Sequence, residues 1–270
     1  MTNLRSSGHD FQSPPVYETA LAVQFEELVS FRTVHFGLFY ESVASRFPVA
    51  EDQPRAEPIV ETFPIVPRQL TLNLVQKNAG PERVWFRDEV DGAVLLQVQP
   101  DRFGLNWRRT SDDAEDPKFR QNGPRFLEEF GKFERFCEQQ FLGKLHPNLC
   151  EVIYVNHIFP LADESALECM ERVLSGVTLK LDNGLPMPEL AAFNRVYPLG
   201  DGKGRLYAEA AVGRHQEKGN FVLLKITARI VHRDGDDVAA NIQLAHDAVV
   251  NGFVAITTPD AKSKLWGQTQ

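Results

Sequence analysis

The sequence predicts an α+β fold made of two β-α-β(3–4)-α units, in which curved antiparallel sheets each pack against a long helix, as in TBP-like or helix-grip-like folds. Three observations lead to this prediction. Short β-forming segments alternate with turn residues, two long segments have apolar residues at helical spacing, and the order of elements repeats. The repeat is one of pattern, with little residue identity between the halves. We expect the two units to fuse edge to edge into one compact sheet, which leaves fewer exposed edges.

The composition is that of a globular protein. Of the 270 residues, 43% are hydrophobic and 24% are charged, so the chain can bury a large core without disulfides. The net charge of -8 disfavours a nucleic-acid partner or an anionic membrane surface. Three cysteines without a CxxC motif are typical of reduced thiols, and neither a signal peptide nor a membrane span is recognised. We therefore expect a cytoplasmic protein with no membrane partner.

The first half is predicted to span residues 15–147, after a polar and disordered N-terminus at 1–14. Residues 16–27 are rich in β-formers and predict a strand. Aromatic residues at helical spacing predict a helix over 33–47. Five prolines then make 48–67 an extended connector that is long enough to wrap over a surface.

A meander and a long helix complete this half. The Asp91-Gly92 pair is a strong hairpin signal between two of the predicted strands. The long helix is predicted over 123–142, with Pro124 in its first turn and apolar residues stepping by three or four. The strands are predicted at 69–76, 82–89, 93–100 and 102–109, and the apolar stripe of the helix is Phe126, Phe130, Phe133, Cys137 and Phe141.

The second half is predicted to span residues 148–270 and to repeat this order. It begins with a strand and a short helix, continues with strands joined by glycine-rich turns, and closes with an amphipathic helix. After that helix, a short capped helix brings Trp266 onto the body of the fold. The predicted strands are 148–161, 190–199, 205–214 and 221–233, and the predicted helices are 163–176 and 240–257.

Three residues are candidates for acid/base catalysis: Glu151, His157 and His246. Alternation puts Glu151 and His157 on one strand face, about 20 Å apart, so each needs a partner from another element. His246 lies at the edge of the apolar stripe of the helix 240–257. An enzyme would need at least two of the three within about 7 Å around a cleft between the halves. The structural alternative is two strand-end residues that reach solvent or a turn, and an interfacial histidine.

A polar stripe in the meander is the candidate binding surface. Gln97 and Gln99 share one face of their strand, and Asn106 and Arg108 share one face of the next. With Trp85 and Trp107 as candidate anchors, these residues predict recognition of a peptide, a nucleotide or an acidic partner. The alternative is a solvated outer face.

The absence of common motifs disfavours an enzyme. There is no P-loop, GxGxxG, GxSxG or HExxH motif, and the histidines are scattered, so we expect no cofactor and no metal site. The favoured function is a non-enzymatic binding module for a partner protein or a small ligand. The alternatives are an acid/base enzyme and a hydrophobic-ligand carrier with a cavity lined by Phe126, Phe130 and Phe133. A homodimer is left open.

Six segments spread over the chain from Pro14 to Gly267 carry a family resemblance. They are PPVYETALAVQFEE, LFYESVASRFP, RVWFRDE, LLQVQPDRFGLNWR, CEVIYVNHI and AHDAVVNGFVAITTPDAKSKLWG. Together they resemble a sporadically distributed bacterial protein family of about this length with no assigned activity. The resemblance implies a single full-length cytoplasmic module and transfers no mechanism. The patchy distribution of the family favours a place in mobile operons, such as defence or toxin–antitoxin loci.

Overall fold

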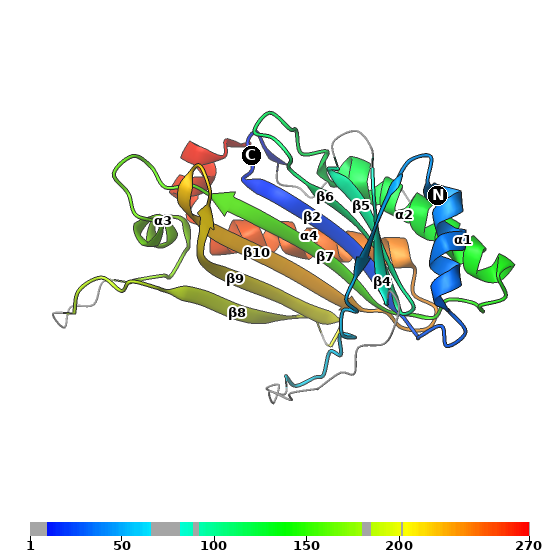
Figure 1. Cartoon of the computed structure of the whole chain (residues 1–270). Coiled ribbons are helices and arrows are strands. Elements are labelled where there is room, and N and C mark those ends of the chain that lie inside the picture. The colour runs from blue at the N-terminus through cyan, green and yellow to red at the C-terminus, as the bar shows by residue number, and fades with distance from the viewer. Residues whose placement is uncertain (1–9, 66–81, 89–91, 180–184, 201, 270) are drawn as a thin grey trace.

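The protein is built around one large curved antiparallel sheet, with helices packed on one of its faces (Figure 1). The computed structural model describes residues 10–65, 82–88, 92–179, 185–200 and 202–269. The predicted α+β class with a curved antiparallel sheet is confirmed. The predicted strand at 69–76 lies outside the described residues.

Two strands from different halves meet at the centre of the sheet. β2 and β7 pair antiparallel there, and each also pairs with the last strand of its own half, β6 and β10 respectively. The two halves therefore form one continuous sheet. From one edge to the other, its strands are β3 (Val49–Gln53), β4 (Arg83–Arg87), β5 (Val94–Gln99), β6 (Arg102–Arg108), β2 (Val16–Phe25), β7 (Pro147–Ile158), β10 (Gly219–Val231), β9 (Gly204–His215) and β8 (Ala192–Leu199).

Three helices cover one face of this sheet: α1 (Thr33–Val43), α2 (Lys118–Gln139) and α4 (Val238–Ile256). α4 lies across β7 and β10, and α2 lies across β6. The short α3 (Ala166–Val173) lies beside the end of α4, where Leu174 and Thr257 form a β-bridge. A π-helical turn, η1 (Ala261–Leu265), follows α4. None of the described helices is both long and apolar enough to cross a lipid bilayer.

Aromatic rings fill the interior between α2 and the sheet. Phe126, Phe130 and Phe133 are at most 3% exposed, and their ring centroids lie 5.2 to 6.2 Å from that of Phe103 on β6. Phe39 of α1 packs against the same cluster. Because these rings occupy the space, the predicted carrier cavity lined by Phe126, Phe130 and Phe133 is wrong.

Several element boundaries differ from prediction. α2 ends at Gln139, so Phe141 of the predicted apolar stripe lies outside the helix and is 93% exposed. α2 begins at Lys118, so Pro124 lies inside the helix and not in its first turn; its ring is on the exposed side. The N-terminal segment 1–14 is described only from residue 10, and that part is ordered. β1 (Asp10–Phe11) pairs with β11 (Gln268–Thr269), and Phe11 packs edge-on against Phe253 at 5.5 Å. The segment is also held by backbone hydrogen bonds from Gln12 and Ser13 to the carbonyls of Gly267 and Trp266.

Candidate functional site

The sheet face that points away from the helices is called the open face here. Side chains alternate along each strand, so the open face carries Glu151 and His157 of β7 and Arg229 of β10, while their neighbours point into the core. The same alternation puts Gln97, Gln99, Asn106 and Arg108 on the open face. Trp107 points the other way and is 5% exposed in the core. The prediction of Trp107 as a surface anchor is therefore wrong.

The predicted polar stripe forms a hydrogen-bonded row across four strands. The Gln97 amide donates to Asn106 Oδ1 at 2.6 Å, and Asn106 Nδ2 donates to Glu18 Oε1 at 2.8 Å. Trp85 Nε1 donates to Gln97 Oε1 at 3.1 Å. Arg108 stays exposed at the end of its strand. Since these amides already bond one another, the row is a structural part of the sheet more than a free surface.

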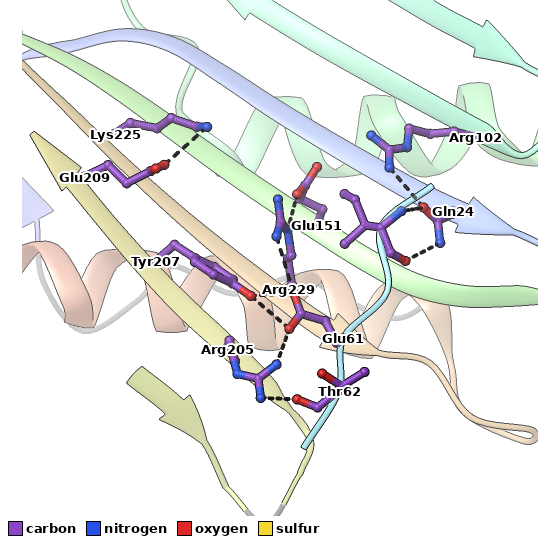
Figure 2. Close-up of polar contacts among 11 residues, drawn as sticks. Gln24, Glu61, Thr62, Arg102, Glu151, Arg205, Tyr207, Glu209, Lys225 and Arg229 are labelled. Carbon is purple, nitrogen blue, oxygen red and sulfur yellow. Dashed lines mark hydrogen bonds and ion pairs between the residues drawn. The ribbon is translucent and has the colours of Figure 1, made fainter. Parts of the chain in front are cut away.

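The connector crosses the open face as an extended strap, defined here as residues 54–65. Two glutamines of the sheet hold its backbone. Gln99 accepts from the Ala56 N–H at 3.3 Å and donates to the Ala56 carbonyl at 3.1 Å. Gln24 does the same with Ile59, at 2.7 and 2.9 Å (Figure 2). Each side-chain amide thus bonds both polar groups of one strap residue, as a neighbouring strand would.

The end of the strap is held by a buried carboxylate. Glu61 reaches down to the sheet between Arg205, Tyr207 and Arg229, and its side chain is 3% exposed (Figure 2). Arg205 forms an ion pair with this carboxylate and also donates to the carbonyl of Thr62. The Tyr207 hydroxyl donates to Glu61 Oε1 at 2.7 Å. These four side chains, Glu61, Arg205, Tyr207 and Arg229, are called the Glu61 clasp below.

A second carboxylate balances part of the positive charge. Glu151, 6% exposed, accepts from Arg229 Nε at 2.7 Å, and Arg229 lies 3.4 Å from Glu61. Burial lowers the pKa of Arg229, but the two carboxylates more than offset this, so that its pKa is raised overall. Burial lowers the pKa of Arg102, which bonds Gln24. The guanidinium groups of Arg205 and Arg229 therefore share Glu61, and Arg229 also pairs with Glu151.

His157 lies at the far end of the open face, away from Glu151. Its ring stacks on Tyr17 at 3.8 Å with an angle of 9° between the planes, and it contacts the Phe221 ring at 4.2 Å in a tilted arrangement. Burial, with a smaller contribution from His215, lowers the pKa of His157 to about 4. It lines a polar cleft of about 750 Å³ together with the loop before α2. The imidazole is neutral at pH 7 and held by its stacking partners.

His246 belongs to α4, on the side of the sheet opposite to the open face, and its side chain is on the buried side of that helix. It is 5% exposed, stacks on Phe119 at 3.8 Å, and its Nδ1 lies 3.2 Å from the Tyr154 hydroxyl. Burial lowers the pKa of His246 to about 4. It lines a separate cavity of about 140 Å³. We predicted an interfacial histidine as the structural alternative to a catalytic one, and His246 occupies such a position.

The three candidate catalytic residues therefore have three separate surroundings. Glu151 is paired with Arg229 under the strap, His157 is stacked at the end of the sheet, and His246 is on the other face. They do not form a common acid/base cleft. Within the described residues, no group of three or more His, Cys, Asp or Glu side chains is arranged to hold a metal ion.

Several residues of this site were missed from the sequence: Gln24, Glu61, Arg205, Tyr207 and Arg229. Glu61 lies 144 residues from Arg205 and stands in a proline-rich connector, which has no periodicity to mark an inward-facing position. Some signal existed in β10, where Lys225, Thr227 and Arg229 alternate with aliphatic residues. That alternation predicts a polar face, although it does not identify what covers it.

No protein-family model matches this sequence, and neither does any curated protein. Among solved structures, the chain has a low similarity to the crystal structure of the di-domain ARO/CYC StfQ from the steffimycin biosynthetic pathway. The TM-score is 0.18 and the sequence identity 10%, over 64% of this chain and 72% of that chain. A similarity this low says nothing about the function of this protein.

Proposed function

We propose that this protein is a non-enzymatic binding module whose open face holds an extended, acidic segment of a partner protein. The observation that carries the proposal is the grip of Gln99 and Gln24 on the strap. Each bonds the N–H and the C=O of one strap residue, Ala56 and Ile59 respectively. This is recognition of a peptide backbone, and any extended chain offers the same groups.

The Glu61 clasp adds a chemical requirement to this backbone recognition. Between the two gripped positions and beyond, strap side chains such as Glu57 and Val60 face solvent. Glu61 is the strap side chain that the sheet surrounds with two arginines and a tyrosine. The site is therefore suited to an extended segment with one carboxylate two residues after a gripped backbone position.

The buried charges around Glu61 decide which peptide segments could replace the strap. Without Glu61, the guanidinium of Arg205 would lose the carboxylate it pairs with, and that of Arg229 would keep Glu151. Leaving a buried charge without its partner costs roughly 3–5 kcal/mol. A competing segment must therefore supply its own acidic group. We regard the strap as an internal occupant of the site, which such a segment displaces.

A labelled peptide with the strap sequence PRAEPIVETFPI, residues 54–65, tests the proposal by fluorescence polarisation. In the wild-type protein the tethered strap competes at an effective concentration of about a millimolar. The Glu61→Gln protein has a weakened strap and an unchanged sheet. We expect it to bind the peptide at least tenfold more tightly than the wild type does. A peptide with Gln in place of Glu61 should lose that gain.

Glu57→Gln is the matched control, because Glu57 is an exposed carboxylate on the same strap. This variant should bind the peptide no better than the wild type. If Glu61→Gln does not fold, Ala56→Pro weakens the strap by removing the N–H that Gln99 accepts. A folded, strap-weakened protein that does not bind the acidic peptide would refute the proposal.

The proposal also covers the class of partner, the relation between the two halves and the cellular setting of the protein. The partner is a protein segment and not a nucleic acid, since the net charge is -8. We infer that the two halves are related units, because in each the first strand pairs with the last. Membership of the sporadic bacterial family, a cytoplasmic location and a mobile operon belong to this proposal, and a homodimer is compatible with it.

A further inference from the structure

A second site lies on the other side of the sheet, in the cavity beneath α4. Its volume of about 140 Å³ is close to the roughly 150 Å³ of an apolar protein cavity that accommodates benzene. Its walls come from the N-terminal segment, the start of α2, strands β7 and β10, and α4. The apolar lining includes Phe11, Val16, Phe119, Ile226, Val249 and Phe253.

A histidine–tyrosine pair lies in this lining, which also holds the charged residues Asp116, Lys118 and Arg120. His246 and Tyr154 both face the cavity and contact each other, with 3.2 Å between Nδ1 and the hydroxyl. Burial raises the pKa of Tyr154 and lowers the pKa of His246 to about 4, so both are neutral at pH 7. The contact fits both neutral tautomers of the imidazole, and we take the one in which the tyrosine hydroxyl donates to Nδ1.

The protonation state of the imidazole follows from this hydrogen bond. A neutral histidine whose Nδ1 accepts must carry its proton on Nε2. The ring is held flat against Phe119, at 3.8 Å and 5° between the planes, so its direction is set. The Asn156 amide donates one bond to the Leu224 carbonyl. The Nε2–H of His246 is then a donor that the lining can present to a guest, beside the cationic side chains of Lys118 and Arg120.

We infer that this cavity is a binding site for a small ring-sized apolar molecule with one hydrogen-bond acceptor, which the Nε2–H of His246 recognises. The inference does not depend on the open face, since the two sites lie on opposite faces of the sheet. The ends of the chain close this cavity. The β1–β11 pair holds Phe11 against Phe253, and both line it.

A route to solvent is present beside the site. The cavity shares Pro14, Val16, Asp116 and Lys118 with the larger polar cleft at the end of the sheet. Burial raises the pKa of Asp116, and this carboxyl stands at the boundary between the two spaces. We therefore expect a neutral guest, because an anionic guest would place a second carboxylate close to that of Asp116.

Two probes of matched shape test the inference. Acetophenone carries a carbonyl acceptor, and α-methylstyrene has a CH₂ group in place of that oxygen. Titrations followed by the methyl resonances of Ile226, Val249 and Val250 report occupancy directly. We expect acetophenone to bind at least tenfold more tightly than α-methylstyrene, with the largest shifts at these methyls. Replacing His246 by Phe, which keeps the ring and removes the donor, should abolish the difference between the probes.

A pair of variants on α4 controls for the site itself. Val250→Trp fills the cavity from its wall, whereas Leu244→Trp adds the same side chain at a position that is 40% exposed. Acetophenone binding should be lost in the first and kept in the second. Equal binding of both probes to the wild type would overturn the role of His246. Unchanged acetophenone binding in Val250→Trp, or no binding to the wild type, would overturn the site.

Discussion

His246 illustrates how one residue couples the interior of this protein to pH. The ring lies between Phe119 and Tyr154, and burial lowers its pKa from 6.5 to about 4. In the unfolded chain the same imidazole binds a proton below about pH 6.5. Between these two values the unfolded state binds more protons than the native state, so native stability falls as pH falls.

We predict that lowering the pH from 7 to 5 reduces the free energy of unfolding by about 2 kcal/mol through His246 alone. His157, whose pKa is also lowered to about 4, adds a loss of the same sign. Urea titrations at pH 7, 6 and 5 measure the slope. His246→Gln should reduce that slope. His146→Gln, at an exposed position, should leave it unchanged. An equal slope in wild type and His246→Gln would contradict the prediction.

At the level of elements, two of the helical glycines, Gly131 of α2 and Gly252 of α4, have different surroundings. Gly131 lies in α2 where an added Cβ would meet only the end of the Arg135 side chain, at 3.6 Å. Gly252 lies on the buried side of α4, where a Cβ would stand 2.5 Å from Leu206 of β9. Leu206 is itself 6% exposed, so it has little room to move. The first glycine is replaceable, and the second is needed for close packing.

The same substitution should therefore have opposite effects at these two sites. Gly131→Ala is expected to raise the free energy of unfolding by about 1 kcal/mol, because alanine is the better helix former. Gly252→Ala should lower it by about 1–3 kcal/mol, the cost of overpacking a filled core. Thermal and urea unfolding of both variants beside the wild type provides the measurement. Stabilisation by Gly252→Ala would mean that α4 packs less closely on β9.

Local patterns predicted most of these elements, and the errors have local causes. Alternation predicted β4, β5 and β6, and four-residue aromatic spacing predicted α2. The start of α2 was missed because the residues before Pro124 are largely polar. Trp107 was assigned to the polar surface although its own alternation groups it with Phe103 and Leu105, both fully buried. The strand register decides which way a side chain points.

On the scale of the whole molecule, the central position of β2 and β7 has the largest effect on the local stability of the sheet. These two strands have a strand on each side, whereas β3 and β8 are the edges of the sheet. The repeated element order anticipated a fused sheet, because each half needs a partner edge. The element order could not predict a contact such as that of Glu61 with Arg205, which joins the two halves through residues far apart in sequence.

We predict a corresponding gradient of hydrogen exchange across the sheet. Backbone amides of β2 and β7 should exchange at least 100-fold more slowly than those of β3 and β8, because opening the centre requires separating both halves. Exchange of the intact protein, read by mass spectrometry after proteolysis, resolves these strands. Amides of β8 that are protected for as long as those of β7 would contradict this prediction.

The manner in which Gln24 and Gln99 hold the strap has an evolutionary consequence. Both glutamines bond main-chain atoms, so the identities of the strap residues above them are not what the contact selects. During divergence, Glu57, Pro58 and Val60, whose side chains face solvent, can be exchanged freely. Gln24, Gln99 and Glu61 should instead be inherited together. Descendants of this chain would then keep Gln24 and Gln99 on the sheet and Glu61 in a strap that otherwise drifts.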